Sequence, residues 1–153
     1  MDSMLHVEAL EKSYSDFKLD NISFDLPAGY IMGLIGPNGS GKTTTIKAIL
    51  NITERDGGKI TVFGKDNIAS EQEIKKDIGV VFDSSSFVDE WTMADVEKAY
   101  RLFYPAWDSE KYWSLLTKFR IGGTKKVKEL SKGMQMKLML ACACLLYTSP
   151  SPR

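Results

Sequence analysis

Two early segments of the chain, residues 5–10 and 22–26, alternate apolar with polar residues. A period of two is typical of strands that bury one face, so both segments are predicted strands. Residues 30–35 and 78–82 are apolar almost throughout, which favours strands buried on both faces of a parallel sheet. A fifth strand is predicted over residues 59–64, after a glycine-containing turn.

Two helices are predicted between these strands. The first runs from about Thr43 to Asn51, where the apolar spacing changes to three and four residues. The second opens at the sequence Ser70-Glu71-Gln72-Glu73, which has the form of a capping box, and ends near Asp77. Strands that alternate with helices predict an α/β fold for this part of the chain.

After Asp83 the pattern becomes helical throughout. Three further helices are predicted: one that begins at Thr92 and ends before Pro105, one that begins at Asp108 and stops at Gly122-Gly123, and one that begins at Ser131. In the first of these, Val96, Tyr100 and Phe103 are spaced to share one buried face.

A glycine-rich loop separates the predicted strand 30–35 from the helix that follows it. It fits the pattern G-x-x-x-x-G-K-[ST] and consists of Gly36, Pro37, Asn38, Gly39, Ser40, Gly41, Lys42, Thr43 and Thr44. Glycines let successive N–H groups turn toward a polyphosphate, and the helix start offers further N–H groups to the same anion. Lys42 is predicted to reach the β- and γ-phosphates and Thr43 to ligate Mg²⁺. The alternative, a turn that binds nothing, leaves all the filled motif positions unexplained.

The composition limits the possible classes of protein but does not indicate a function. A chain of 153 residues that is 43% hydrophobic can bury the core of one ordinary soluble domain. Its 20 basic and 20 acidic residues cancel, which gives no support for bulk attraction to nucleic acid or anionic lipid. The amino terminus lacks a secretory pattern, and the longest apolar run, residues 138–146, is too short to cross a bilayer. Cys142 and Cys144 lack the partner pair of a zinc site.

The carboxyl end departs from the helical pattern that precedes it. Residues 144–153 finish on Ser-Pro-Ser-Pro-Arg and match the translation of a common sequencing adapter. We therefore predict that residues 144–153 are not native and that the native sequence after Ala143 is missing. The alternative is a genuine proline-rich terminus.

The phosphate loop, the helical segment and the sequence Glu129-Leu130-Ser131-Lys132-Gly133-Met134, in this order, resemble the ATP-binding subunit of an ABC transporter. The resemblance runs from about Leu5 to Ala143. It implies an α/β fold of the P-loop NTPase class, with an antiparallel β subdomain and a helical insert, incomplete at the carboxyl end. Residues 1–82 are then the nucleotide-binding core with its Walker A loop, and residues 83–143 the helical subdomain.

The family carries an LSGGQ-type signature in that subdomain. Leu130, Ser131 and Gly133 match it, while Lys132 and Met134 replace a glycine and a glutamine. Ser131 at a helix start offers a hydroxyl and first-turn N–H groups to an anion, although it could also serve only as a helix cap. In the family this segment closes over the nucleotide of the opposite subunit, and Lys132 lies near that phosphate or points to solvent. The LSKGM form resembles bacterial subunits of peptide-antibiotic export and resistance.

The resemblance also assigns two single residues. Tyr14 stands where the family places an aromatic ring on adenine. Asp83 stands where the family has a glutamine near Mg²⁺, so it is either a hard oxygen ligand or a plain helix cap. The acidic Walker B strand and the later histidine of the family are absent, and His6 is predicted to be structural. We expect the 153-residue chain to bind nucleotide weakly and to hydrolyse little, although its parent is an ATPase.

The function implied is an ATP-hydrolysing subunit, with ATP and Mg²⁺ as cofactors, that powers transport, with export favoured over import. Its partners are a second ATP-binding subunit and a transmembrane permease, which would hold it at the cytoplasmic face of the plasma membrane. Phe87, Val88 and Trp91 are candidate permease contacts, or else core residues. The alternatives are a non-transport ABC ATPase acting on ribosomes or nucleic acid, which the neutral charge disfavours, and a non-catalytic nucleotide-binding module.

Overall fold

The computed structural model describes residues 3–85 and 87–147, and it forms two compact units that divide between Lys75 and Lys76. We call the first the sheet unit and the second the helical unit. Residues 76–82, which the sequence places with the nucleotide-binding core, group with the helical unit. Of the segment predicted to be foreign, residues 148–153 lie outside the described residues.

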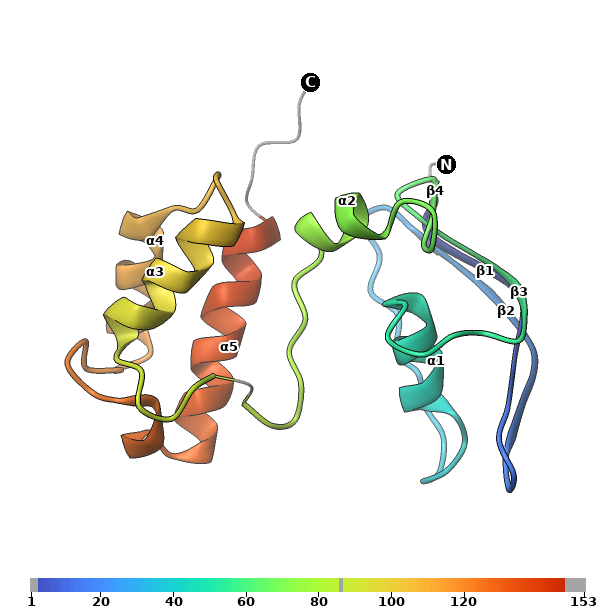
Figure 1. The fold of residues 1–153 in the computed structure, drawn as a ribbon, viewed down its shortest axis with the longest axis horizontal. Helices are drawn as coiled ribbons and strands as arrows, with labels where there is room; N and C mark the ends of the chain where they lie inside the picture. Colours follow the sequence, from blue (N-terminus) through green and yellow to red (C-terminus); the bar gives the residue numbers. More distant parts are fainter. Residues whose placement is uncertain (1–2, 86, 148–153) are drawn as a thin grey trace. The chain divides into compact units, whose positions relative to one another are not determined.

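The sheet unit contains an antiparallel sheet with strand order β2-β1-β3-β4 (Figure 1). Its strands are β1 (Ser3–Ser13), β2 (Lys18–Pro27), β3 (Gly57–Val62) and β4 (Lys65–Asp66). Its helices are α1 (Lys42–Ile49) and α2 (Glu71–Lys76), of which the last residue of α2 groups with the helical unit. The central strand β1 pairs on both sides, so that Val7 faces Phe24 on β2 and Ile60 on β3. The strands predicted over 5–10 and 22–26 are confirmed, and the one predicted over 59–64 begins two residues earlier.

One predicted detail of α2 is wrong. Glu73 does not form a capping box with Ser70, because its carboxylate pairs with the Lys65 ammonium instead. The Asp66 carboxylate holds the turn before α2 by accepting the N–H groups of Ile68 and Ala69 at 2.9 and 3.0 Å. These bonds lower the pKa of Asp66, with the bond from Ala69 as the largest cause.

The strands predicted over residues 30–35 and 78–82 are also wrong for the structure of this chain. Both segments lie outside the sheet, and Ile31 and Ile35 are essentially fully exposed, at 101% and 98%. A strand forms only when a neighbouring strand accepts hydrogen bonds from its N–H groups and donates hydrogen bonds to its C=O groups. Among the described residues neither segment has such a neighbour. Apolarity therefore indicated a strand whose partners the described part of the chain does not supply.

The helical unit consists of α3 (Met93–Phe103), α4 (Ser109–Lys118), the 3-10 turn η1 (Val127–Glu129) and α5 (Lys132–Tyr147). All three predicted helix starts are confirmed. Thr92 and Asp95 form a reciprocal capping box, the Asp108 side chain accepts the N–H of Lys111 at 2.9 Å, and the Ser131 hydroxyl accepts the N–H of Met134 at 3.3 Å. Each cap satisfies N–H groups that the helix itself leaves unbonded.

The helices α3, α4 and α5 lie side by side around one apolar cluster (Figure 1). Tyr112 is fully buried at its centre and donates its hydroxyl hydrogen to the carbonyl of Met93 at 3.0 Å, which ties α4 to the first turn of α3. Cys142 is buried in the same cluster, and burial raises its thiol pKa to about 12. Such a thiol stays protonated and inert, as expected for a structural cysteine.

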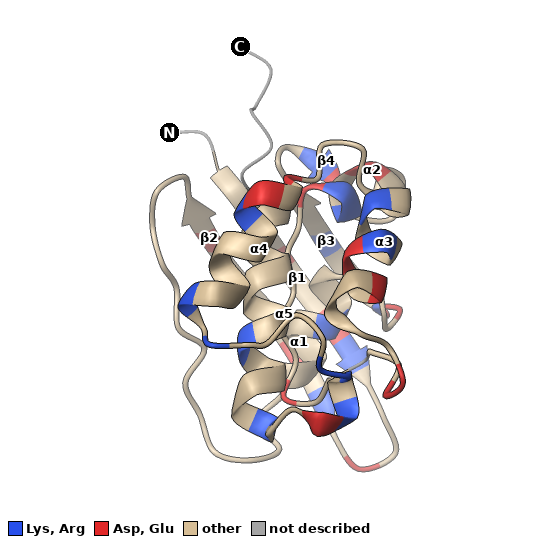
Figure 2. Ribbon diagram, turned by 90° about the vertical axis from the view of Figure 1, so that its left-hand side faces the viewer, with Lys and Arg blue, Asp and Glu red and all other residues tan. Residues whose placement is uncertain are grey.

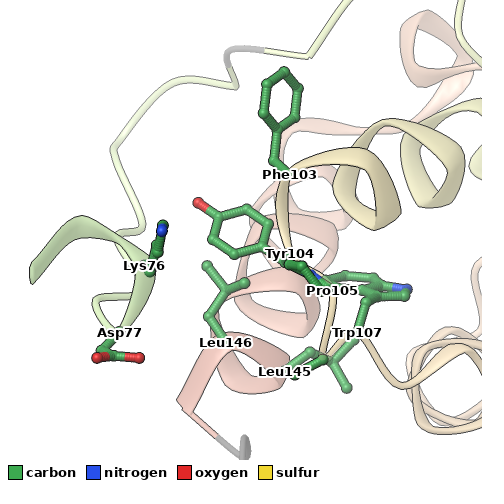
Figure 3. Close-up of a pocket in the computed structure, with 9 residues that line it drawn as sticks. Lys76, Asp77, Phe103, Tyr104, Pro105, Trp107, Leu145 and Leu146 are labelled. Carbon is green, nitrogen blue, oxygen red and sulfur yellow. The ribbon is translucent and has the colours of Figure 1, made fainter. Parts of the chain in front are cut away.

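Phe103 is not on the buried face predicted for it. It is 75% exposed, and the neighbouring Leu102 is 76% exposed. Tyr104 and Trp107, in the turn after α3, occupy the space beside Tyr100 instead, with ring centroids 5.7 and 4.9 Å from its own. Phe103 consequently lies at the rim of a cavity of about 110 Å³ that Trp107 and the end of α5 also line (Figure 3).

The last helix extends further than the sequence predicted. The pattern was expected to break at Cys144, but α5 continues to Tyr147, and Leu145 is 3% exposed within the apolar cluster. Within residues 3–85 and 87–147 no helix has both the length and the apolar character needed to cross a membrane. Acidic and basic residues are spread over elements of both units rather than gathered on one of them (Figure 2).

His6 joins the first two strands through a charged pair. Its Nδ1 lies 2.6 Å from the Asp25 carboxylate across the β1–β2 ladder, and its Nε2 lies 3.8 Å from Glu8. The hydrogen bond raises the pKa of His6 and lowers that of Asp25. The pair stabilises the ladder most at a pH above the ordinary pKa of aspartate and below the ordinary pKa of histidine. The His6 contribution is lost as pH rises through its raised pKa, and the Asp25 contribution is lost as pH falls through its lowered pKa.

We expect the imidazole of His6, the single histidine of the chain, to titrate above its ordinary pKa of 6.5 in a proton NMR titration. Asp25→Asn should lower that midpoint because it removes the charged acceptor, whereas Glu8→Gln, which alters the weaker and longer contact, should change it less. Equal midpoints in wild type and Asp25→Asn would contradict the cross-strand pair.

Candidate nucleotide site

The loop between residue 36 and α1 has the backbone form that a phosphate cradle requires. Gly39 and Gly41 adopt left-handed φ values of +81° and +91°, and the N–H of Ser40 donates to the carbonyl of Pro37 at 3.3 Å to close the turn. Gly41 is the N-cap of α1 and has no side chain with which to cap it. Among the described residues of the first turn of α1 none is acidic. The start of α1 is therefore left to an external anion.

Lys42 folds back over this loop. Its ammonium group donates to the carbonyls of Gly36 and Pro37 at 2.8 and 2.7 Å and lies 3.4 Å from the Ser40 hydroxyl. The ammonium thus stands at the loop that would hold the phosphates, and a polyphosphate offers it a charged acceptor in place of two neutral carbonyls. Thr45, the fourth residue of α1, stabilises the helix start: its N–H and its hydroxyl both donate to the carbonyl of Gly41.

Tyr14 lies in the turn between β1 and β2 and is 49% exposed. Its N–H donates to the carbonyl of Phe17 at 2.8 Å, and the two rings are stacked with centroids 6.5 Å apart. One aromatic side chain is therefore supported by another while much of its surface stays open. Such a ring can stack on a nucleobase.

No pattern in the sequence indicated the residues that hold this turn. Lys12 places its ammonium 5.6 Å from the centre of the Tyr14 ring and pairs with Asp56 at 2.8 Å. The second oxygen of Asp56 accepts the N–H of Ser13 at 2.7 Å. The bond from Lys12 is the largest cause of the lowered pKa of Asp56, and the bond to Asp56 likewise raises the pKa of Lys12. Asp56 comes from the glycine-containing turn, so only the fold reveals its role.

Phe17, which stacks on Tyr14, also lies against the phosphate loop (residues 36–44). We call Tyr14 and Phe17 the base platform. A Cβ atom built on Gly41 would lie 2.8 Å from the Phe17 ring and 2.6 Å from the Leu19 side chain. Glycine is thus required at position 41 both by its φ value and by this close approach. Tyr14 and the loop residues 36–44, both predicted from the sequence, belong to one continuous surface of the sheet unit.

The signature residues lie at the start of α5 in the helical unit. Ser131, Lys132 and Gly133 are all exposed there. Gln135, which the sequence did not single out, donates its side-chain amide to the carbonyls of Val127 and Leu130 at 3.2 and 3.5 Å. These bonds hold η1 against the first turn of α5, and they fix the backbone on which Ser131 is presented.

A second support comes from Glu90 in the loop before α3. Its carboxylate accepts from Lys126 at 2.9 Å and from Lys128 at 2.5 Å, which lowers its pKa to about 2, with the bond from Lys128 as the largest cause. The N–H of Val127 also donates to the carbonyl of Trp91 at 2.8 Å. The loop before α3 and the segment before the signature are therefore joined by both main-chain and side-chain bonds.

Asp83 faces the signature helix. It lines, together with Lys132 and Gln135, a cleft of about 360 Å³ that Met136 and Met139 close at the apolar side. The three proposed permease contacts are not equivalent: Phe87 and Trp91 pack against the apolar cluster, whereas Val88 is 49% exposed. The core interpretation therefore holds for Phe87 and Trp91.

The side chains at this site supply too few ligands to hold a magnesium ion by themselves, but they fit one that is also bound by phosphate. The Thr43 side chain is exposed at the start of α1, and a hydroxyl is the hard oxygen donor that Mg²⁺ prefers. Asp83 belongs to the other unit, so a joint ligand set with Thr43 stays a prediction. No group of three or more histidine, cysteine or acidic residues within the described part of the chain could hold a metal alone. Phosphate oxygens and water would therefore supply the remaining ligands.

Comparison with known proteins decides the family. A model of the ABC transporter family matches residues 19–149. This chain belongs to the ABC transporter family of ATP-binding proteins. The match includes most of residues 144–153, the segment predicted to be foreign.

Relatives in the family include both import and export proteins. The Nod factor export ATP-binding protein I of Burkholderia pseudomallei is 32% identical over 142 residues, covering 89% of this chain and 47% of the relative. The phosphonates import ATP-binding protein PhnC 2 of Haloarcula marismortui is 27% identical over 161 residues, covering 93% of this chain and 59% of the relative. The chain thus spans about half the length of the curated ABC relatives it matches.

The fold is also that of ABC ATP-binding subunits. A solved structure described as the ATP binding subunit of an ABC transporter matches with a TM-score of 0.83 and 27% identity, covering 94% of this chain and 62% of that one. The predicted fold class, a P-loop NTPase with an antiparallel β subdomain and helices, is confirmed. The peptide-antibiotic export subgroup remains a hypothesis from the LSKGM sequence.

Proposed function

We propose that the full-length protein binds MgATP through residues 36–44 and hydrolyses it to drive a transporter. The observation that carries this proposal is the open, uncapped start of α1 with the Lys42 ammonium folded across the loop that precedes it. Membership of the ABC family supports ATP as the nucleotide. The glycine backbone, the helix start and the cation meet at one place, as a triphosphate requires.

Each residue of the site has a distinct task in this proposal. The amides of the loop and the first turn of α1 bind phosphate oxygens, and Lys42 exchanges its carbonyl partners for the β- and γ-phosphates. Thr43 would provide an oxygen for Mg²⁺. Bound Mg²⁺ would neutralise charge on the phosphates during transfer. Tyr14 stacks on the base, which adds affinity without strong selection among bases.

Hydrolysis in this proposal needs two subunits. Ser131, Lys132 and Gly133 would close over the nucleotide held by a second ATP-binding subunit, with Lys132 adding a positive charge near the γ-phosphate. Their exposure at the start of α5 supports this role. Gln135 and Glu90 would keep this surface in place.

The transport partner would be a transmembrane permease, bound through exposed apolar residues of the helical unit such as Val88, Leu102 and Phe103. This places the protein at the cytoplasmic face of the plasma membrane. We favour export, on the LSKGM form of the signature, although relatives of both directions match the chain. The balanced charge supports a protein partner over nucleic acid.

The direct test is a calorimetric titration of MgATP into the full-length protein, repeated with inorganic tripolyphosphate as competitor. We expect saturable MgATP binding that tripolyphosphate displaces, since both ligands would compete for the same amides and the same ammonium. Absence of binding, or MgATP binding that a saturating level of tripolyphosphate leaves unchanged, would overturn the assignment of the site.

A further inference from the structure

A buried asparagine holds the far end of the phosphate-loop helix. Asn67 follows β4 and is 2% exposed, which is unusual for an amide side chain. Its Nδ2 group donates to the carbonyls of Ala48 and Ile49, at 2.9 and 3.0 Å. These carbonyls belong to the last turn of α1, where a helix has no further turn to supply N–H partners, and the Ala48 carbonyl also accepts the N–H of Asn51 at 3.1 Å. Asn67 thus closes the end of α1 opposite to the phosphate loop.

The amide of Asn67 is itself fixed on two sides. Its main-chain N–H donates to the carbonyl of Ile60 on β3 at 3.1 Å, and its Oδ1 accepts from the guanidinium of Arg55 at 2.5 Å. Arg55, whose side chain is 12% exposed, also donates to the carbonyl of Gly58 at 3.1 Å. A guanidinium can only donate and helix carbonyls can only accept, so the orientation of the amide is determined by its partners.

These contacts fix α1 at both of its ends. At its start, Gly41 abuts Phe17, which stacks on Tyr14. At its end, Asn67 joins it to β3 and β4. A helix of eight residues is rigid over about 12 Å, so a shift at one end is transmitted to the other. The distance between the phosphate loop and the Tyr14 ring therefore depends on Asn67.

We propose that Asn67, oriented by Arg55, is a positioning residue that sets the phosphate loop at the distance from Tyr14 that a complete nucleotide spans. The proposal rests on the nucleotide site proposed above. A ligand that binds through the loop alone, such as tripolyphosphate, needs no such distance. A ligand that contacts both the loop and the Tyr14 ring needs that distance to be set in advance. Its two contacts contribute their full binding free energy only when the protein already holds the loop and the ring at the right separation.

The test compares Mg-tripolyphosphate with MgATP in calorimetric titrations of the full-length protein. Asn67→Ala should weaken MgATP binding roughly tenfold, the size of one base–aromatic stack, while tripolyphosphate binding changes less than about twofold. Tyr14→Ala should likewise weaken the binding of MgATP but not that of tripolyphosphate. Combining the two changes should weaken MgATP little more than either alone, because both remove the same contribution.

A matched control exists two residues beyond the helix end, at Asn51. Asn51→Gly also removes an amide side chain, one that donates to Glu71 at 2.8 Å and makes no bond to the α1 carbonyls, and glycine suits its φ of +51°. It should leave the affinities for both ligands within about twofold of wild type. Arg55→Lys provides a second variant that keeps the charge but loses the forked contacts, and it should show the MgATP split in weaker form.

The outcomes separate this inference from the proposed function. If wild type binds neither ligand, the nucleotide site itself is wrong. If wild type binds both, but Asn67→Ala and Arg55→Lys weaken MgATP and tripolyphosphate equally, Asn67 is only structural and the inference is overturned. Full additivity of Asn67→Ala with Tyr14→Ala would overturn it too. Thermal melts by circular dichroism establish which variants fold, and Arg55→Lys decides the question if Asn67→Ala does not.

Discussion

Full-length protein with Lys42→Ala is expected to bind MgATP roughly ten- to a hundredfold more weakly than wild type, the range for losing a hydrogen bond to a charged group. Its hydrolysis rate should fall by roughly a hundredfold or more, because the ammonium also stabilises charge that develops in phosphoryl transfer. Affinity is measured by calorimetry and turnover by release of inorganic phosphate.

The control for this change is on the same helix. Lys47 lies in the last turn of α1, away from the loop, and Lys47→Ala removes an equal charge. It should leave affinity and turnover close to wild type, since the loop contacts belong to Lys42. Equal losses in both variants would mean that net charge alone attracts the nucleotide, and equal activity in all three proteins would remove Lys42 from the mechanism.

The second large effect is expected at Gly41. In Gly41→Ala, the new methyl group meets the Leu19 and Phe17 side chains at 2.6 and 2.8 Å, and the backbone must hold a φ of +91°. We expect a loss of about 2–4 kcal/mol in the free energy of unfolding, from left-handed strain and overpacking together. MgATP affinity should fall as well, because Phe17 cannot yield without moving the ring of Tyr14 that it supports.

Gly39→Ala separates the two causes. Gly39 has a similar φ of +81°, but no atom lies within 4 Å of the position of an added Cβ. This variant should lose only the strain, about 1–2 kcal/mol. Urea denaturation followed by circular dichroism measures both changes. If the two variants are equally destabilised, the contact between the loop and the base platform contributes nothing.

Local sequence signals predicted much of this structure. The start of α3 was predictable because Thr92 and Asp95 supply reciprocal caps within four residues, and the loop before α1 was predictable because its glycines and Lys42 have fixed spacing. In each case the interacting groups are neighbours in the chain. The chemistry of such a motif is complete before any tertiary contact forms.

Features that depend on distant partners were not predictable in this way. In the sequence, Asn67 has the pattern of a polar residue in a turn. Its hydrogen bond to the end of α1 forms only because the fold brings the two segments together. Phe103 has the spacing of a buried residue, but the turn after α3 fills its place with Trp107. The apolar residues 30–35 indicated a strand of a parallel sheet, but an apolar run carries no information on whether a neighbouring strand is present to pair with it.

The exposure of residues 30–35 bears on how the protein is made in the cell. A ribosome adds about a hundred residues between Ile35 and Ser131, which takes roughly 5 to 20 s at ordinary elongation rates. Throughout that time Ile31 and Ile35 have no apolar cover from the sheet unit. Exposed apolar residues of a nascent chain are bound by chaperones, so residues 30–35 are a segment that a chaperone would shield during this time.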